Sequence, residues 1–124
     1  MLYVYVALGG ALGAVVRFAL GSWVLHHAGD GFPWPTLLIN VTGSLLLGWL
    51  LRTFPAADAA PVARALLAVG FCGAYTTFST FGYETLTLLE ARSYAAAAGY
   101  VASSVLLGLA AVATGAWLAA RTAG

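Results

Sequence analysis

The sequence has little charge and almost no cysteine. Only 7% of its 124 residues are charged, whereas about a quarter are charged in an average soluble domain. Five bases, all of them arginine, and four acids are too few to cover the surface that a soluble protein of this size leaves in water. We therefore exclude a water-soluble globule and expect an integral membrane protein that is surrounded by lipid.

The same scarcity excludes several functions. The arginines form no run, and the net charge is +1, so nucleic acid is not an expected partner. Cys72 is the only cysteine, which excludes an intrachain disulfide and disfavours a thiolate metal site. No nucleophile, base and orienting group occur together, and no phosphate-binding loop is present, so we do not expect an enzyme.

Apolar residues, 62% of the total, gather in four long stretches. About 20 apolar residues in a helix span the hydrocarbon core of a membrane. We expect an all-α, single-domain membrane protein with helices over residues 3–25, 36–51, 61–89 and 94–120. The first stretch lacks a basic start and continues past Phe18, which predicts a retained helix rather than a signal peptide. The short connections make successive helices antiparallel.

The arginines give only a weak preference for one orientation in the membrane. Four spans place both termini on one side, together with Arg52, Arg64 and Arg121. Arg92 lies on the other side, joined by Arg17 if that residue belongs there. Because this bias is weak by the positive-inside rule, we predict that the chain inserts both ways and pairs with itself head to tail. The alternative, a single orientation set by the small bias, stays open.

Polar groups inside the first two helices need a partner or water. Gly9 and Gly13 predict a close approach of a neighbouring helix. Arg17 must reach an interface, a backbone carbonyl or water, and we expect it to be a structural anchor. In the second helix Asn40 lies one turn before Ser44 in an otherwise apolar segment. Its amide suits either a contact between helices or a pore lining, and both interpretations stay open.

The third helix holds a dense polar and aromatic segment between residues 70 and 84. Gly73 lies at mid-span, and the β-branched hydroxyl residues after it compete for backbone hydrogen bonds, which predicts a break near mid-membrane. Carbonyls freed by such a break are ligands for a cation. Phe78 and Phe81 share a helix face. Glu84 suits either a proton carrier or a vestibule carboxylate.

The fourth helix adds two more polar residues, Tyr100 and Ser104, which lie one turn apart. Hydroxyls, one amide and two phenyl rings then predict a path for a small solute. These groups donate hydrogen bonds without a fixed charge, which suits the replacement of the hydration shell of a small, hard anion. A phenyl edge would face an anion and a phenyl face a cation, and the sequence leaves the direction of the rings open.

Three segments together resemble the Fluc fluoride channels, also called CrcB proteins. They read Gly9-Gly10-x-x-Gly13-Ala14-x-x-Arg17, Thr36-Leu37-x-x-Asn40-x-x-Gly43 and Gly70-Phe71-Cys72-Gly73-x-x-Thr76-Thr77-Phe78-Ser79-Thr80-Phe81-x-x-Glu84. The resemblance covers all four helices in order, and its third motif is long and specific. It implies a passive channel in the plasma (inner) membrane that exports fluoride from the cytoplasm through two pores of an antiparallel, dual-topology homodimer.

The resemblance also implies roles for single residues. Phe78 and Phe81 match the pore phenylalanines whose ring edges face fluoride, and Asn40 matches the pore asparagine. Gly73 and Thr76 match the residues at the break whose backbone carbonyls, two from each subunit, hold a structural sodium ion.

Further residues match the polar track and the vestibule of that family. The track residues are Ser79, Thr80, Tyr100 and Ser104. Arg17 and Glu84 match positions with a vestibule or structural role. The chain departs from its relatives at Ala74 and Pro35, where many have glycine, and at Gly108, where some have serine. These departures leave the phenylalanine pair and Asn40 unchanged.

Two other functions stay open on the sequence. A proton-coupled small multidrug exporter is also a short, four-helix, dual-topology protein. Its chemistry needs a membrane carboxylate in the substrate site, usually in the first helix, and here Glu84 is the only candidate. A non-transporting assembly subunit is disfavoured by polar stripes on three helices. For a fluoride channel the expected partners are fluoride, a second copy of the chain and membrane lipid, and the expected cofactor is sodium.

Overall fold

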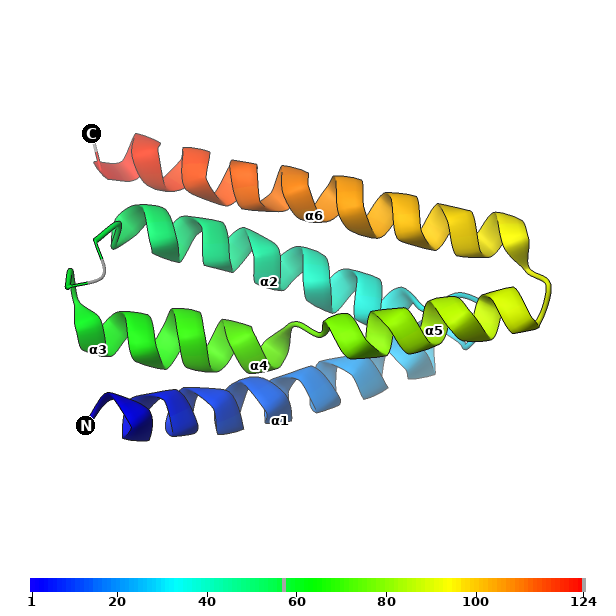
Figure 1. Cartoon of the computed structure of the whole chain (residues 1–124), viewed down its shortest axis with the longest axis horizontal. Helices are drawn as coiled ribbons and strands as arrows, with labels where there is room; N and C mark the ends of the chain where they lie inside the picture. Colours follow the sequence, from blue (N-terminus) through cyan, green and yellow to red (C-terminus); the bar gives the residue numbers. More distant parts are fainter. Residues whose placement is uncertain (57, 124) are drawn as a thin grey trace.

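The computed structural model describes residues 1–56 and 58–123, and these residues form four helical columns that lie side by side (Figure 1). The first column is α1 (Leu2–Ala28) and the second is α2 (Trp34–Thr53). The fourth column is α6 (Tyr94–Ala123). The third column has four parts, which are α3 (Pro61–Ala63), η1 (Arg64–Cys72), α4 (Gly73–Tyr75) and α5 (Phe78–Glu90).

The prediction of an all-α protein with four spans is confirmed. Four helical segments are long and apolar enough to cross a membrane, and each predicted range lies inside one of them. Both ends of the chain and the α2–α3 connection lie at one end of the molecule, and the other two connections lie at the opposite end (Figure 1). Successive columns are therefore antiparallel, as their short connections predict.

Prolines and a left-handed glycine set several helix ends. Pro35 and Pro61 occupy the first turns of α2 and α3, where the missing N–H costs nothing. Gly29 follows α1 with φ of 77°, and its N–H bonds to the Leu25 carbonyl. Only glycine adopts this φ without steric cost, so it ends α1 and turns the chain toward α2.

Glycines bring the columns together in two tight pairs. Side chains added at Gly9 or Gly13 would overlap the backbone carbonyls of Leu66 and Phe71 in η1. The predicted close approach at these two glycines is therefore confirmed. Gly48 and Gly115 bring α2 and α6 into similar contact. In lipid such close packing, rather than a hydrophobic driving force, holds helices together.

Candidate functional site

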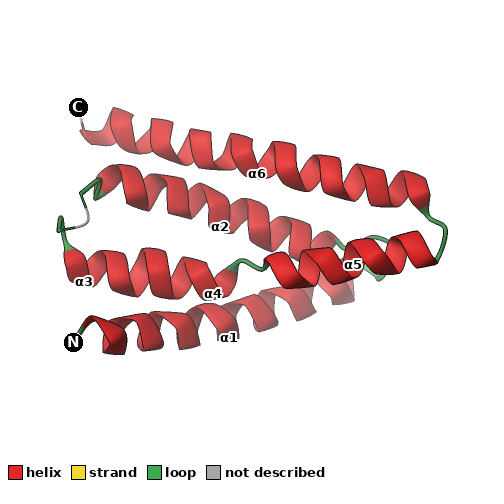
Figure 2. Cartoon of the chain, viewed as in Figure 1, coloured by secondary structure: helices red, strands yellow, loops and turns green. Residues whose placement is uncertain are grey.

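The third column is broken in the middle, as the sequence predicts. α4 ends at Tyr75 and α5 begins at Phe78, with a short connection between them (Figure 2). Thr76 and Thr77 are extended, with φ of −80° and −148°. Gly73 itself is still helical, with φ of −61°, so the break lies at the two threonines rather than at the glycine. Extended φ values are open to any residue, and β-branched threonine favours them.

Asn40 of α2 holds the break with both ends of its side-chain amide. Its Nδ2 donates to the Thr77 carbonyl at 3.0 Å, and its Oδ1 accepts from the Thr77 N–H at 2.8 Å. In an unbroken α-helix the Thr77 N–H would bond to the Gly73 carbonyl. Because the Thr77 N–H donates to Asn40 instead, the Gly73 carbonyl lacks its usual helical donor. The amide therefore makes a contact between helices, and one of its N–H groups stays available.

Arg17 of α1 satisfies a second backbone group at the break. Its Nε donates to the Ala74 carbonyl at 3.0 Å. That carbonyl would otherwise have accepted from the Phe78 N–H, which now lies in the first turn of α5. Of the three partners open to Arg17 on the sequence, the structure shows the backbone carbonyl.

Thr77 caps the N-terminus of α5. Its Oγ1 accepts from the Thr80 N–H at 3.3 Å and donates to the Thr80 Oγ1 at 3.0 Å. A threonine at the N-cap position is a common helix start, so the sequence contained this signal, although we predicted no role for Thr77. The contact of Tyr75, whose hydroxyl lies 2.8 Å from the Thr42 Oγ1, was not predicted either. The two residues are far apart in the sequence, so no local pattern indicates this contact.

A cavity of about 290 Å³ lies beside the break, between α2, α5 and α6. It brings together four of the residues expected to line the path, which are Asn40, Phe78, Phe81 and Ser104. The Phe78 and Phe81 rings are 5.8 Å apart at an angle of 50°. The Ser104 Oγ is buried and has no hydrogen-bond partner among the described residues. The Phe78 side chain is 82% exposed, so this cavity is open along α5.

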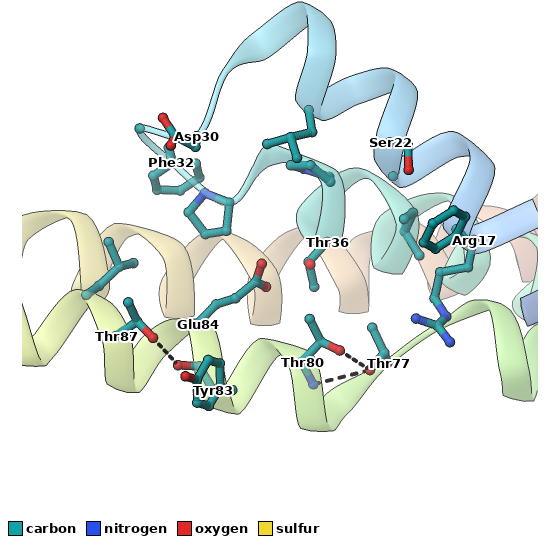
Figure 3. Close-up of a pocket in the computed structure, with 18 residues that line it drawn as sticks. Arg17, Ser22, Asp30, Phe32, Thr36, Thr77, Thr80, Tyr83, Glu84 and Thr87 are labelled. Carbon is teal, nitrogen blue, oxygen red and sulfur yellow. Dashed lines mark hydrogen bonds between the residues drawn. The ribbon is translucent and has the colours of Figure 1, made fainter.

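A second cavity, of about 490 Å³, lies between α1, the start of α2 and α5 (Figure 3). Arg17, Thr80 and Glu84 line it, together with Asp30 from the α1–α2 loop. The cavity thus carries charges of both signs, in contrast to the cavity beside the break.

Tyr100 connects these two regions. It is completely buried, its hydroxyl donates to the Glu84 Oε1 at 2.9 Å, and its ring lies 5.1 Å from the Phe81 ring. Ser79 is exposed on α5 and is not among the residues that line either cavity. A single chain therefore brings Tyr100 to Phe81, but Ser104 and Thr80 line different cavities and Ser79 lines neither.

The arrangement suits a small anion better than a cation or a catalytic reaction. The cavity beside the break offers the free N–H of Asn40, the hydroxyl of Ser104 and two phenyl rings, without a charged group in its lining. Such donors replace the water around an anion, and no proton has to be exchanged.

Comparisons with known proteins agree with the motifs. Residues 4–116 match the family model described as CrcB-like protein, Camphor Resistance (CrcB). A relative from Thermus thermophilus, named fluoride-specific ion channel FluC, is 48% identical over 107 residues, which cover 86% of this chain and 84% of the relative. A relative of the same name from Acidobacterium capsulatum is 47% identical over 113 residues, which cover 90% of each chain. The match extends from the first span to the last and includes the break with the residues that hold it, and the chain belongs to the CrcB family.

Proposed function

We propose that the protein is a fluoride-specific ion channel of the plasma membrane. The observation that carries this proposal is the cavity beside the break, where Asn40, Phe78, Phe81 and Ser104 converge without a charged group. Fluoride is small and strongly hydrated, so it needs several donors to leave water. The amide N–H, the hydroxyl and the positive edges of the rings supply them. The name shared by the relatives agrees with this chemistry.

Conduction is passive in this proposal. A proton-coupled exporter needs a titratable group in the substrate site, and the lining of the cavity beside the break contains none. Glu84 lies apart from it, in the larger cavity, where Tyr100 binds its Oε1. Fluoride then moves down its own gradient, and a cell that has taken up fluoride as the neutral acid exports the anion.

The working unit in this proposal is an antiparallel dimer with two pores. Its support is α5, which buries no side chain within one chain. Phe78 and Tyr83 on this helix are 82% and 72% exposed. A second copy of the chain would cover Phe78 and close the open side of the cavity beside the break. The weak charge bias allows the two copies to insert in opposite orientations.

A structural sodium ion between the two copies fits the residues at the break. The Gly73 carbonyl has lost its helical donor to Asn40, and Thr76 is extended, so its carbonyl points out of the helix path. A Cβ added at Gly73 would meet nothing within 4 Å, so no other segment of the described chain packs against this position. Both carbonyls would hold the ion, which would supply positive charge that neutralises the freed dipoles.

Different residues have different roles in the proposed conduction path. Asn40 both holds the break and donates one N–H into the cavity, so a change there affects structure and conduction together. Phe78 and Phe81 line the passage, and Tyr100 supports Phe81 from behind. The Ser104 hydroxyl, which lacks a protein partner among the described residues, is free to donate to the passing ion.

The test is a flux assay on purified protein in liposomes, with a fluoride electrode and a chloride electrode. We expect fast fluoride efflux and chloride efflux at the level of empty liposomes. Equal flux of the two anions would contradict the proposal. The variant Glu84→Gln separates it from proton-coupled export, because fluoride efflux that persists without a proton gradient in this variant excludes a carboxylate-coupled mechanism.

A further inference from the structure

Phe32, in the loop between α1 and α2, ends a row of aromatic rings that begins at the break. The ring centroids of Phe78 and Phe81 are 5.8 Å apart, and those of Phe81 and Tyr100 are 5.1 Å apart. The Tyr100 ring then lies 5.5 Å from the Phe32 ring and meets it edge to face, at 84°. Aromatic quadrupoles favour this geometry, so each ring restricts the position of the next.

The loop holds Phe32 firmly. Pro33 follows it and restricts its backbone to extended conformations. The N–H of Trp34, the first residue of α2, donates to the Phe32 carbonyl at 2.8 Å. The centroids of the Trp34 and Phe32 rings are 4.8 Å apart. The Phe32 ring therefore has a fixed support behind it and Tyr100 in front of it.

Phe32 contacts the Tyr100 ring and also lines the larger cavity. It lines that cavity together with Glu84 and Asp30, and Figure 3 shows Phe32 beside Asp30 at the end of the cavity away from Arg17. Tyr100 is nevertheless completely buried. The edge-to-face contact places the Phe32 ring over Tyr100, so its removal would leave space beside the Tyr100 ring that opens into the cavity.

We propose that Phe32 is a positioning residue of the conduction pathway. It holds the Tyr100 ring against Phe81, and through that contact it keeps the Phe81 ring in the cavity beside the break. This inference rests on the proposed function, and it assigns a role in conduction to a loop residue outside the three family motifs.

The experiment measures fluoride and chloride efflux from liposomes for the wild type and Phe32→Ala. We expect Phe32→Ala to lower fluoride efflux by about three- to tenfold, the range that the loss of one aromatic contact produces. Phe32→Tyr keeps the ring and restores efflux to within about twofold of the wild type. The matched control is Trp23→Ala, at the same end of the molecule, whose ring contacts His27 rather than the row. It leaves efflux unchanged.

A double substitution tests whether Phe32 acts through Tyr100. In the Tyr100→Leu background, Phe32→Ala should cause no further loss, because the ring that it positions is already gone. Losses that multiply would overturn the inference, as would wild-type efflux from Phe32→Ala in an assay where the wild type conducts. A wild type that does not conduct fluoride would instead overturn the proposed function. If Phe32→Ala does not fold, Phe32→Leu takes its place in both comparisons.

Discussion

The two halves of the third column differ in how they are held. The half before the break buries Ala65, Ala68, Gly70 and Cys72, and it packs closely against the glycines of α1. The half after the break, α5, buries no residue, and it is held by the Thr77 cap, by the turn after Glu90 and by the contacts of Phe81 and Glu84 with Tyr100. The first half is thus scaffold, whereas the second presents its side chains to a cavity and, in our proposal, to a second copy.

The largest effect is expected in the scaffold half. Gly9→Ala would place a methyl group on the Leu66 carbonyl, and neither backbone can move without separating α1 from η1. We expect a loss of stability above about 3 kcal/mol, the upper end of the cost of overpacking, and no folded protein in detergent. The neighbouring Gly10→Ala is the control, because its new Cβ lies 3.9 Å from the nearest atom. Size-exclusion profiles that do not differ would contradict the tight packing of this half.

The next effect concerns α5 and separates folding from conduction. Phe78→Ala removes a ring that its own chain leaves exposed, so we expect each chain to keep its helical fold in detergent while fluoride efflux falls by at least about tenfold. Leu89→Ala, near the end of α5 and away from both cavities, is the control and retains efflux. Full efflux from Phe78→Ala would remove this residue from the pathway.

Asn40 links the two halves, so its substitutions should affect both properties. Asn40→Ala loses two hydrogen bonds to Thr77, which we expect to cost about 2 kcal/mol and to lower fluoride efflux. Asn40→Asp keeps the acceptor for the Thr77 N–H, but it sets a carboxylate oxygen against the Thr77 carbonyl and adds unpaired negative charge to the cavity. We therefore expect a stability loss at least as large as that of Asn40→Ala, with efflux abolished. Thermal melts and efflux are measured on the same samples. A clearly smaller stability loss for Asn40→Asp than for Asn40→Ala would contradict the role of the Nδ2 donor.

The smallest effect is expected at the end of α5. Arg92 has a positive φ of 59°, and the Ser93 N–H bonds to the Leu88 carbonyl, as in a turn that usually contains glycine. Arg92→Gly should therefore stabilise the protein by about 0.5–1 kcal/mol relative to Arg92→Ala, which loses the same charge but keeps the Cβ. The melting temperatures of the two variants decide this, and a lower value for the glycine variant would contradict it.

Much of this architecture could be predicted from the sequence. In lipid a polar residue needs a partner or water, and small residues at a fixed spacing indicate close packing of helices. The four spans, the close approach at Gly9 and Gly13 and the break in the third column were all predicted. The exact place of the break was not, because it depends on a bond from Asn40, on another helix, to the Thr77 backbone. Side chains that act across helices leave no local pattern.

The candidate site was predicted in part, for a similar reason. Asn40, Phe78, Phe81 and Ser104 meet in one cavity, as expected of a shared path. Thr80 lines the other cavity and Ser79 lines neither. The reason is that neighbouring residues of an α-helix point in directions about 100° apart. The roles implied for these residues by the family remain predictions.

In our proposal the Phe81 ring on α5 controls the passage of fluoride. Fluoride efflux from liposomes containing Phe81→Ile tests this, because the substitution keeps an apolar side chain next to Tyr100 but removes the ring. We expect folded protein with fluoride efflux reduced to the level of empty liposomes. Folded Phe81→Ile protein that releases fluoride at the wild-type rate would contradict it.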